Sequence, residues 1–199
     1  MKDNRPFSSQ LESWLNSKHP KTVADLAEVF HDKSFAVGLL ILMFIPALPL
    51  PTGGVTHIFE IVAMLLSLEV FLGKRTVWLP RRWRTKNITG IGERKSVTVL
   101  IKQLRWVEKY SKPRLKQLVG NSLFMRATGL ALFIFCLAAF LAPPFSGLDT
   151  LPSLAVVFIA LSVILEDFIL YVLGLLVGAV GIGAILVLGT ALFRSFRLL

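Results

Sequence analysis

The sequence predicts an all-α fold: a polytopic helical membrane protein in which two proline-broken helical hairpins, candidates for re-entrant hairpins, form an internal repeat. Three observations support this prediction. Hydrophobic residues make up 54% and charged residues 17% of the 199 residues, which is too apolar for a soluble domain of this length. The apolar residues are gathered into runs of helical length. Two of these runs end in prolines, which the interior of a helix excludes.

Basic residues are concentrated in the middle of the chain. Residues 74–126 contain fifteen Lys and Arg and two acidic residues, whereas residues 1–33 contain five of each kind. Because cytoplasmic loops are enriched in Lys and Arg, we expect the central loop to be cytoplasmic. Arg194 and Arg197 favour the same side for the C-terminus, but more weakly, so the side of the C-terminus stays open. Residues 1–14 contain no apolar run, so no cleaved signal peptide is expected.

The first half divides into residues 1–33, predicted to form two amphipathic helices, and 34–73, predicted to form the first membrane hairpin. Phe35–Ile45 has eleven residues, roughly 16 Å of helix and about half of a hydrocarbon core. The three prolines that end this run are Pro46, Pro49 and Pro51. Val55–Leu72 is nearly long enough to cross and ends in a basic stop, so the hairpin is expected to enter from the cytoplasm and return there.

Residues 74–122 are expected to form a basic amphipathic loop on the cytoplasmic membrane surface. Trp78 and Trp83 lie among Lys and Arg, and an amphipathic stretch follows between Ile101 and Tyr110. Aromatic and basic residues in this arrangement are typical of contact with anionic lipid headgroups. No nucleic-acid partner is expected, since no stacking or zinc motif accompanies the charges.

The second half, residues 123–199, is predicted to be a second hairpin followed by a glycine-rich membrane segment. Leu123–Ala142 is apolar, Pro143 and Pro144 break it, and Leu151–Leu165 is apolar again. After Glu166 and Asp167, Phe168–Phe193 would be roughly 39 Å long as a helix, which is too long for one untilted crossing. Its glycines favour either close packing on a neighbour or a bend near Gly181.

The two hairpins resemble each other in sequence. FAVGLLILMFIPALPLP and RATGLALFIFCLAAFLAPP share a glycine, an apolar run and terminal prolines. Such repeats place a binding site between two halves whose broken helices meet near the midplane. Both hairpins enter from the basic side by their charges, which favours parallel over inverted repeats.

Acidic residues inside the apolar segments are the sharpest candidates for a functional site, because a carboxylate at mid-membrane costs roughly 2.5 to 3.5 kcal/mol. His57, Glu60, Met64 and Ser67 share one helix face by their spacing. This stripe fits an ion or proton path, with a carboxyl and an imidazole that both titrate. The alternative interpretation is that His57 and Glu60 only anchor the hairpin at the outer interface.

Glu69 points away from Glu60, because nine residues at 100° each separate opposite helix faces. A pair with Lys74 or Arg75 would satisfy it, which favours anchoring. A two-residue turn at Glu166 and Asp167 without Gly, Pro or Asn is disfavoured. Either the helix continues through these residues and buries them, or it breaks there and their side chains cap a new helix.

Three stretches together resemble the ExoD family of bacterial membrane proteins, which is associated with exopolysaccharide synthesis. They are VFHDKSFAVGLLILMFIPALPLPTGG, LLSLEVFLGKRTVWLPRRWRTKNI and LAPPFSGLDTLPSLAVVFIALSVILEDFILYVLG. The family signature residues fall on Asp32, Lys33, Gly73, Arg75, Trp78, Leu79 and Pro80, and a further motif on Pro113, Arg114 and Leu115. Where the family often has Arg-Asp-Gly, this chain has Glu166, Asp167 and Phe168, and Glu69 replaces a frequent Gln.

Two functions remain open at this stage. The first is movement of a small solute or ion through the inner membrane by a homo-oligomer, coupled to protons at Glu60, Glu69 or Asp167. The second is an accessory or scaffold role in the exopolysaccharide machinery. No enzyme, cofactor or metal site is expected, since the sequence has no metal-ligand spacing, nucleophile elbow or phosphate loop. The enzymatic alternative that stays open is an intramembrane lipid-linked transferase with Glu166 or Asp167 as its base.

Overall fold

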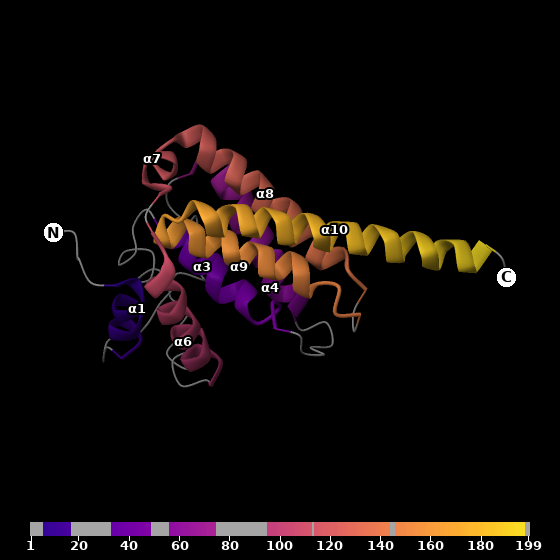
Figure 1. The fold of residues 1–199 in the computed structure, drawn as a ribbon. Coiled ribbons are helices and arrows are strands. Elements are labelled where there is room, and N and C mark those ends of the chain that lie inside the picture. The colour runs from indigo at the N-terminus through magenta and orange to yellow at the C-terminus, as the bar shows by residue number, and fades with distance from the viewer. Residues whose placement is uncertain are drawn as a thin grey trace.

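The computed structural model describes residues 6–16, 33–48, 56–74, 95–112, 114–143 and 146–197. Within these ranges every regular element is a helix (Figure 1). The elements are α1 (Phe7–Asn16), α3 (Ser34–Phe44), α4 (Thr56–Phe71), α6 (Lys95–Tyr110), α7 (Lys116–Val119), α8 (Ser122–Leu141), α9 (Thr150–Leu165) and α10 (Phe168–Arg197). The predicted all-α class is confirmed for this part of the chain.

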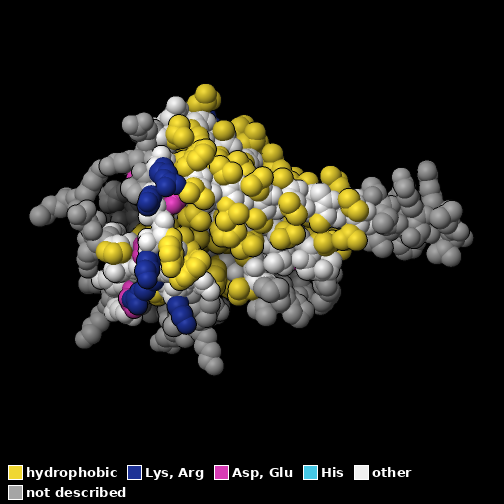
Figure 2. Space-filling model, in the orientation of Figure 1, with side chains coloured by type: hydrophobic (Ala, Val, Ile, Leu, Met, Phe, Trp, Pro, Cys, Tyr) yellow, Lys and Arg dark blue, Asp and Glu magenta, His cyan; other side chains and the backbone are white. Residues whose placement is uncertain are grey.

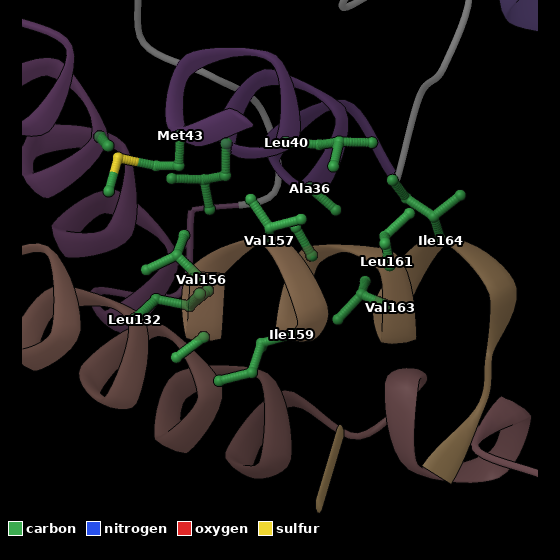
Figure 3. Packing of buried hydrophobic residues seen from close by; sticks show 14 of the residues in the cluster. Ala36, Leu40, Met43, Leu132, Val156, Val157, Ile159, Leu161, Val163 and Ile164 are labelled. Carbon is green, nitrogen blue, oxygen red and sulfur yellow. The ribbon is translucent and has the colours of Figure 1, made fainter. Parts of the chain in front are cut away.

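Helix α9 forms the centre of the bundle. Eleven of its sixteen residues are buried, and it packs against α3, α8 and α10, while α4 packs against α8 and α3. Figure 3 shows Ala36, Leu40 and Met43 of α3 in the same cluster as Val157 and Leu161 of α9. A helix that is apolar on all sides has to be enclosed by other apolar surfaces, which explains this central place.

Among the described helices, two are long and apolar enough to cross a membrane. They are α8, over Ser122–Leu141, and the first part of α10, over Phe168–Leu188. Helix α3 has 11 residues and α9 has 16, about 16 and 24 Å, which is less than a hydrocarbon core of about 30 Å. Hydrophobic side chains cover the face of the bundle formed by these helices (Figure 2).

The two helix pairs, α3 with α4 and α8 with α9, run in the same direction along the bundle. Lys33, just before α3, donates a hydrogen bond to the Ile164 carbonyl near the end of α9 at 2.7 Å. A Cβ at Gly73, after α4, would lie 2.8 Å from Nε of Arg126 near the start of α8. Helices α3 and α8 therefore begin, and α4 and α9 end, at one end of the bundle, which we call the basic end because Lys and Arg gather there (Figure 2).

Helix α10 corrects the expectation for the C-terminus. It begins at the basic end and continues as one helix of 30 residues, about 45 Å, that projects beyond the rest of the bundle (Figure 1). The backbone at Arg194 and Arg197 therefore lies at the end opposite the basic end, not on the same side. Two arginines are a weak charge signal compared with the fifteen Lys and Arg of residues 74–126.

Three glycines of α10, Gly174, Gly178 and Gly181, pack closely on neighbouring helices, and the helix continues through Gly181. A Cβ at Gly174 would lie 2.7 Å from Cγ1 of Ile159, and one at Gly181 would lie 2.8 Å from Cδ of Pro152. The two predicted roles of these glycines are close packing on a neighbour and a bend near Gly181. The structure shows close packing, which small residues permit because they let two helices approach each other.

The turn between α9 and α10 consists of Glu166 and Asp167 alone. This corrects the expectation that a two-residue turn without Gly, Pro or Asn is disfavoured here. Glu166 adopts the left-handed conformation, with φ 57° and ψ 34°. The N–H groups of both residues bond to the Ser162 carbonyl, and that of Asp167 does so at 3.0 Å. The Glu166 bond is the 5→1 bond of the αL motif, and the Asp167 bond is the 6→1 bond that also occurs in the Schellman motif. Bonds from elsewhere hold Glu166 in place: Lys33 pairs with its carboxylate at 3.0 Å and the Leu115 N–H donates to its carbonyl at 2.6 Å.

Glu166→Gly is expected to be more stable than Glu166→Ala by about 1 kcal/mol, because glycine adopts the left-handed conformation without the penalty that a Cβ imposes. Both variants lose the half-exposed pair with Lys33, which contributes about 0 to 1 kcal/mol. Thermal unfolding of the two variants in the same detergent micelle measures the difference. Equal stabilities would show that the backbone at this position is not strained.

Candidate functional site

The polar stripe of α4 lies inside the bundle. The side chains of Glu60 and Ser67 are fully buried, and the next turn of the same face carries His57. The His57 Nδ1 atom lies 2.7 Å from Oε2 of Glu60. The His57 side chain is 28% exposed, and its ring packs edge-on against Phe140 of α8. A buried carboxyl is thus joined to an imidazole that reaches the surface.

Glu60 has one oxygen that no described group satisfies. Oε2 bonds to His57, whereas Oε1 is buried and has no hydrogen-bond partner among the described residues. Because an unsatisfied buried acceptor costs about 1 to 3 kcal/mol, such an atom is a candidate for binding a proton, a cation or water. The charge of Asp149, before α9, also acts on Glu60, so one charged group of the second hairpin influences the carboxyl.

Glu60 lies toward the end of the bundle opposite the basic end. It is the fifth of the sixteen residues of α4, about 6 Å along the helix from its start at Thr56. Its partner His57 packs against Phe140, one residue before α8 ends at Leu141. The carboxyl is therefore buried about one turn inside that end of the bundle.

Smaller polar side chains are also buried between the helices, and most of them bond within their own helix. Ser67 Oγ donates to the Ala63 carbonyl at 2.8 Å and lies 3.9 Å from Sγ of Cys136. Thr128 Oγ1 and the Tyr171 hydroxyl are 3.1 Å apart. The sequence interpretation missed the Thr128 and Tyr171 pair, because single hydroxyls in apolar runs are common and their partner lies on another helix.

The structure places Glu69 apart from Glu60. Its carboxylate pairs with Lys74 at 3.3 Å at the basic end, as one predicted alternative has it. This geometry is that of a partly exposed ion pair.

Asp167 caps α10. Its Oδ1 accepts a hydrogen bond from the Ile169 N–H at 2.8 Å, and Oδ2 accepts one from the Lys112 N–H at 2.9 Å. Burial opposes the charge, but these backbone hydrogen bonds favour it, so the pKa of Asp167 is lowered. The sequence leaves open whether the helix continues through Glu166 and Asp167 or breaks there. In the structure it breaks, and Asp167 caps the new helix.

Glu166 and Asp167 therefore join three segments that are distant in sequence: the start of α3 through Lys33, the connection from α6 to α7, and the turn from α9 to α10. Leu115 from that connection is fully buried. The joint contains three of the positions at which the sequence resembles the family motifs: Lys33, Leu115 and Asp167.

Several predicted site residues lie outside the described residues. They are Asp32, Pro49, Pro51, Arg75, Trp78, Leu79, Pro80, Pro113 and Pro144. Pro46 lies in the turn that follows α3, and Pro143 lies just after α8. Among the side chains that are described, no group of three or more His, Cys, Asp or Glu is arranged to hold a metal ion.

The fold and site define a helical protein with two apolar helices long enough to span a membrane and a buried carboxyl between its two helix pairs. The chain belongs to the ExoD family, described as exopolysaccharide synthesis, whose model matches residues 7–188. It is 24% identical over 153 residues to an uncharacterized protein of Synechocystis sp., covering 75% of this chain and 71% of that protein. No solved structure matches. The resemblance found in the sequence is confirmed.

Proposed function

We propose that this ExoD family protein moves a small solute or ion across the bacterial inner membrane and that His57 and Glu60 couple the movement to protons. The observation that carries the proposal is the fully buried carboxyl of Glu60, with one oxygen bonded to a partly exposed imidazole and the other without a described partner. His57 can exchange a proton with water and pass it to Glu60, because an imidazole both accepts and donates protons and its Nδ1 atom lies 2.7 Å from Oε2 of Glu60. The basic loop is cytoplasmic in this proposal, and the link to exopolysaccharide production is indirect.

The contacts favour Glu60 over the other two candidate carboxyls. Glu69 pairs with Lys74 near the basic end, and Asp167 accepts two backbone N–H groups as a helix cap. A proton carrier has to change its charge in each cycle, and permanent hydrogen bonds to the charged form oppose that change. Of the three candidate carboxyls, we therefore assign the coupling to Glu60.

The helix arrangement supports a site between two parallel repeats. Helices α4 and α9 each have 16 residues, and each is followed by a residue with positive φ, Gly73 after α4 and Glu166 after α9. Each pairs with the first helix of the other half, α4 with α8 and α9 with α3. Two copies of one hairpin related by a twofold axis along the membrane normal would pack in this way, because the axis that brings α4 next to α8 also brings α9 next to α3. We propose a homo-oligomer, because so few short helices enclose little of a pathway.

The decisive measurement is flux in liposomes that contain the purified protein and a pH-sensitive dye, under an imposed pH gradient and with a panel of small ions and solutes. We expect a protein-dependent, pH-driven flux that Glu60→Gln lowers by about a hundredfold, the size of a lost proton-transfer group. Glu69→Gln is the matched control and should leave the rate within about twofold, since Glu69 pairs at the surface.

Two outcomes would count against the proposal. If the folded protein moves nothing across the panel, the scaffold role in the exopolysaccharide machinery is favoured. If flux is present and Glu60→Gln leaves its pH dependence unchanged, the protein is a transporter whose coupling lies elsewhere.

A further inference from the structure

Helix α6 has one face that is covered by α1. Leu104 of α6 and Leu11 of α1 are both about 1% exposed, and the Ser8 N–H donates to the Glu108 carboxylate at 2.8 Å. The Ser8 hydroxyl bonds to the same carboxylate. These contacts fix the rotation of α6 about its own axis, and with it the direction of the opposite face.

The opposite face of α6 is basic and aromatic. Trp106 and Tyr110 are 64% and 65% exposed, respectively, and their ring centroids are 5.3 Å apart. Lys102, Arg105 and Lys109 are exposed beside them, and Arg105, at the edge of this face, also pairs with Glu12 of α1. At 100° per residue these five side chains span about 140° of the helix circumference, and Leu104 lies outside that arc. We call these five residues the basic aromatic face.

We propose that the basic aromatic face binds the anionic phospholipid headgroups of the membrane surface at the basic end. Trp and Tyr prefer headgroup depth because their rings are apolar and their N–H or O–H groups are polar. Lys and Arg beside them are attracted to anionic lipid. The face requires no transport activity, so this proposal is independent of the proposed function.

The position of α6 on the molecule supports a lipid surface as the partner. The Lys112 N–H, two residues after α6 ends, bonds to Asp167, and the apolar helix α10 begins at the next residue. Exposed apolar residues start at the same level, with Phe168 at 45% and Ile169 at 57% exposed. Figure 2 shows Lys and Arg grouped where the hydrophobic surface of the bundle ends. The basic aromatic face thus lies at the boundary between apolar and polar surface.

Fluorescence quenching of Trp106 in nanodiscs tests the proposal with the full chain. In a variant with Trp14, Trp78 and Trp83 replaced by Phe, a fixed fraction of acyl-brominated phosphatidylglycerol in phosphatidylcholine is compared with the same fraction of brominated phosphatidylcholine. We expect quenching to be at least about twofold greater with the brominated anionic lipid, because basic side chains concentrate it. Raising the salt concentration should reduce the difference, since salt screens surface charges.

Lys102→Gln with Lys109→Gln should remove the preference for the anionic lipid, whereas the matched control, Lys102→Arg with Lys109→Arg, should keep it. If the triple Phe background does not fold, the Trp106 signal is obtained as the difference between the natural chain and Trp106→Phe. Equal quenching by the two lipids would overturn the anionic preference. Absence of quenching in folded protein would overturn the membrane contact and favour a protein partner for this face.

Discussion

Gly129→Ala is expected to lower the free energy of unfolding by about 2 to 3 kcal/mol, because a methyl group forced into a rigid contact costs this much. Gly129 lies on α8 where it crosses α4. A Cβ there would lie 2.8 Å from the carbonyl carbon of Val70 and closer still to the backbone nitrogen of Phe71. Backbone atoms within a helix cannot move aside as a flexible side chain can, so the two helices would have to separate.

Gly183→Ala is the matched control for Gly129→Ala. Gly183 also lies within a helix, α10, but a Cβ there would meet nothing within 4 Å. Alanine should therefore be neutral or stabilise by up to about 1 kcal/mol through helix propensity. Thermal unfolding in one detergent, followed by circular dichroism, compares the two variants. Similar midpoints would show that α4 and α8 do not approach closely at this crossing.

The positions of the apolar helices could be predicted from the sequence because length and hydropathy are local properties. The apolar runs Phe35–Ile45 and Leu151–Leu165 correspond to helices α3 and α9 within one residue at each end. The family resemblance was also accessible, since its motifs are short and contiguous. The second amphipathic helix expected before residue 33 lies outside the described residues.

Contacts between distant segments could not be predicted in the same way. Lys33 and Glu166 are far apart in the chain, and no sequence period links them, yet their pair holds a left-handed residue in the turn from α9 to α10. Turn rules based on Gly, Pro and Asn fail there because tertiary bonds supply the energy that the residue type lacks. The partner of His57 could be predicted, because it lies one turn away on the same helix.

Loss of the Asp167 carboxylate should have the second large effect on stability. Asp167→Ala removes the cap of α10 and leaves the Lys112 N–H without its acceptor, which together should cost about 2 to 3 kcal/mol. Asp149→Ala is the matched control. Asp149 also precedes a helix, α9, but its side chain makes no cap hydrogen bond, so its loss should cost less than about 0.5 kcal/mol.

The pH dependence of stability distinguishes the stabilisation that comes from the charge of Asp167 from the stabilisation that comes from its hydrogen-bond geometry. Because the folded-state pKa is lowered below the unfolded value of about 3.9, the carboxylate contributes its full stabilisation above that unfolded value. The contribution is lost as pH falls through the folded-state pKa. Asp167→Asn should therefore be less stable than the natural chain at neutral pH, and the difference should shrink below about pH 4. Unfolding midpoints across this range measure it, and a constant difference would show that hydrogen-bond geometry, not charge, makes Asp167 stabilising.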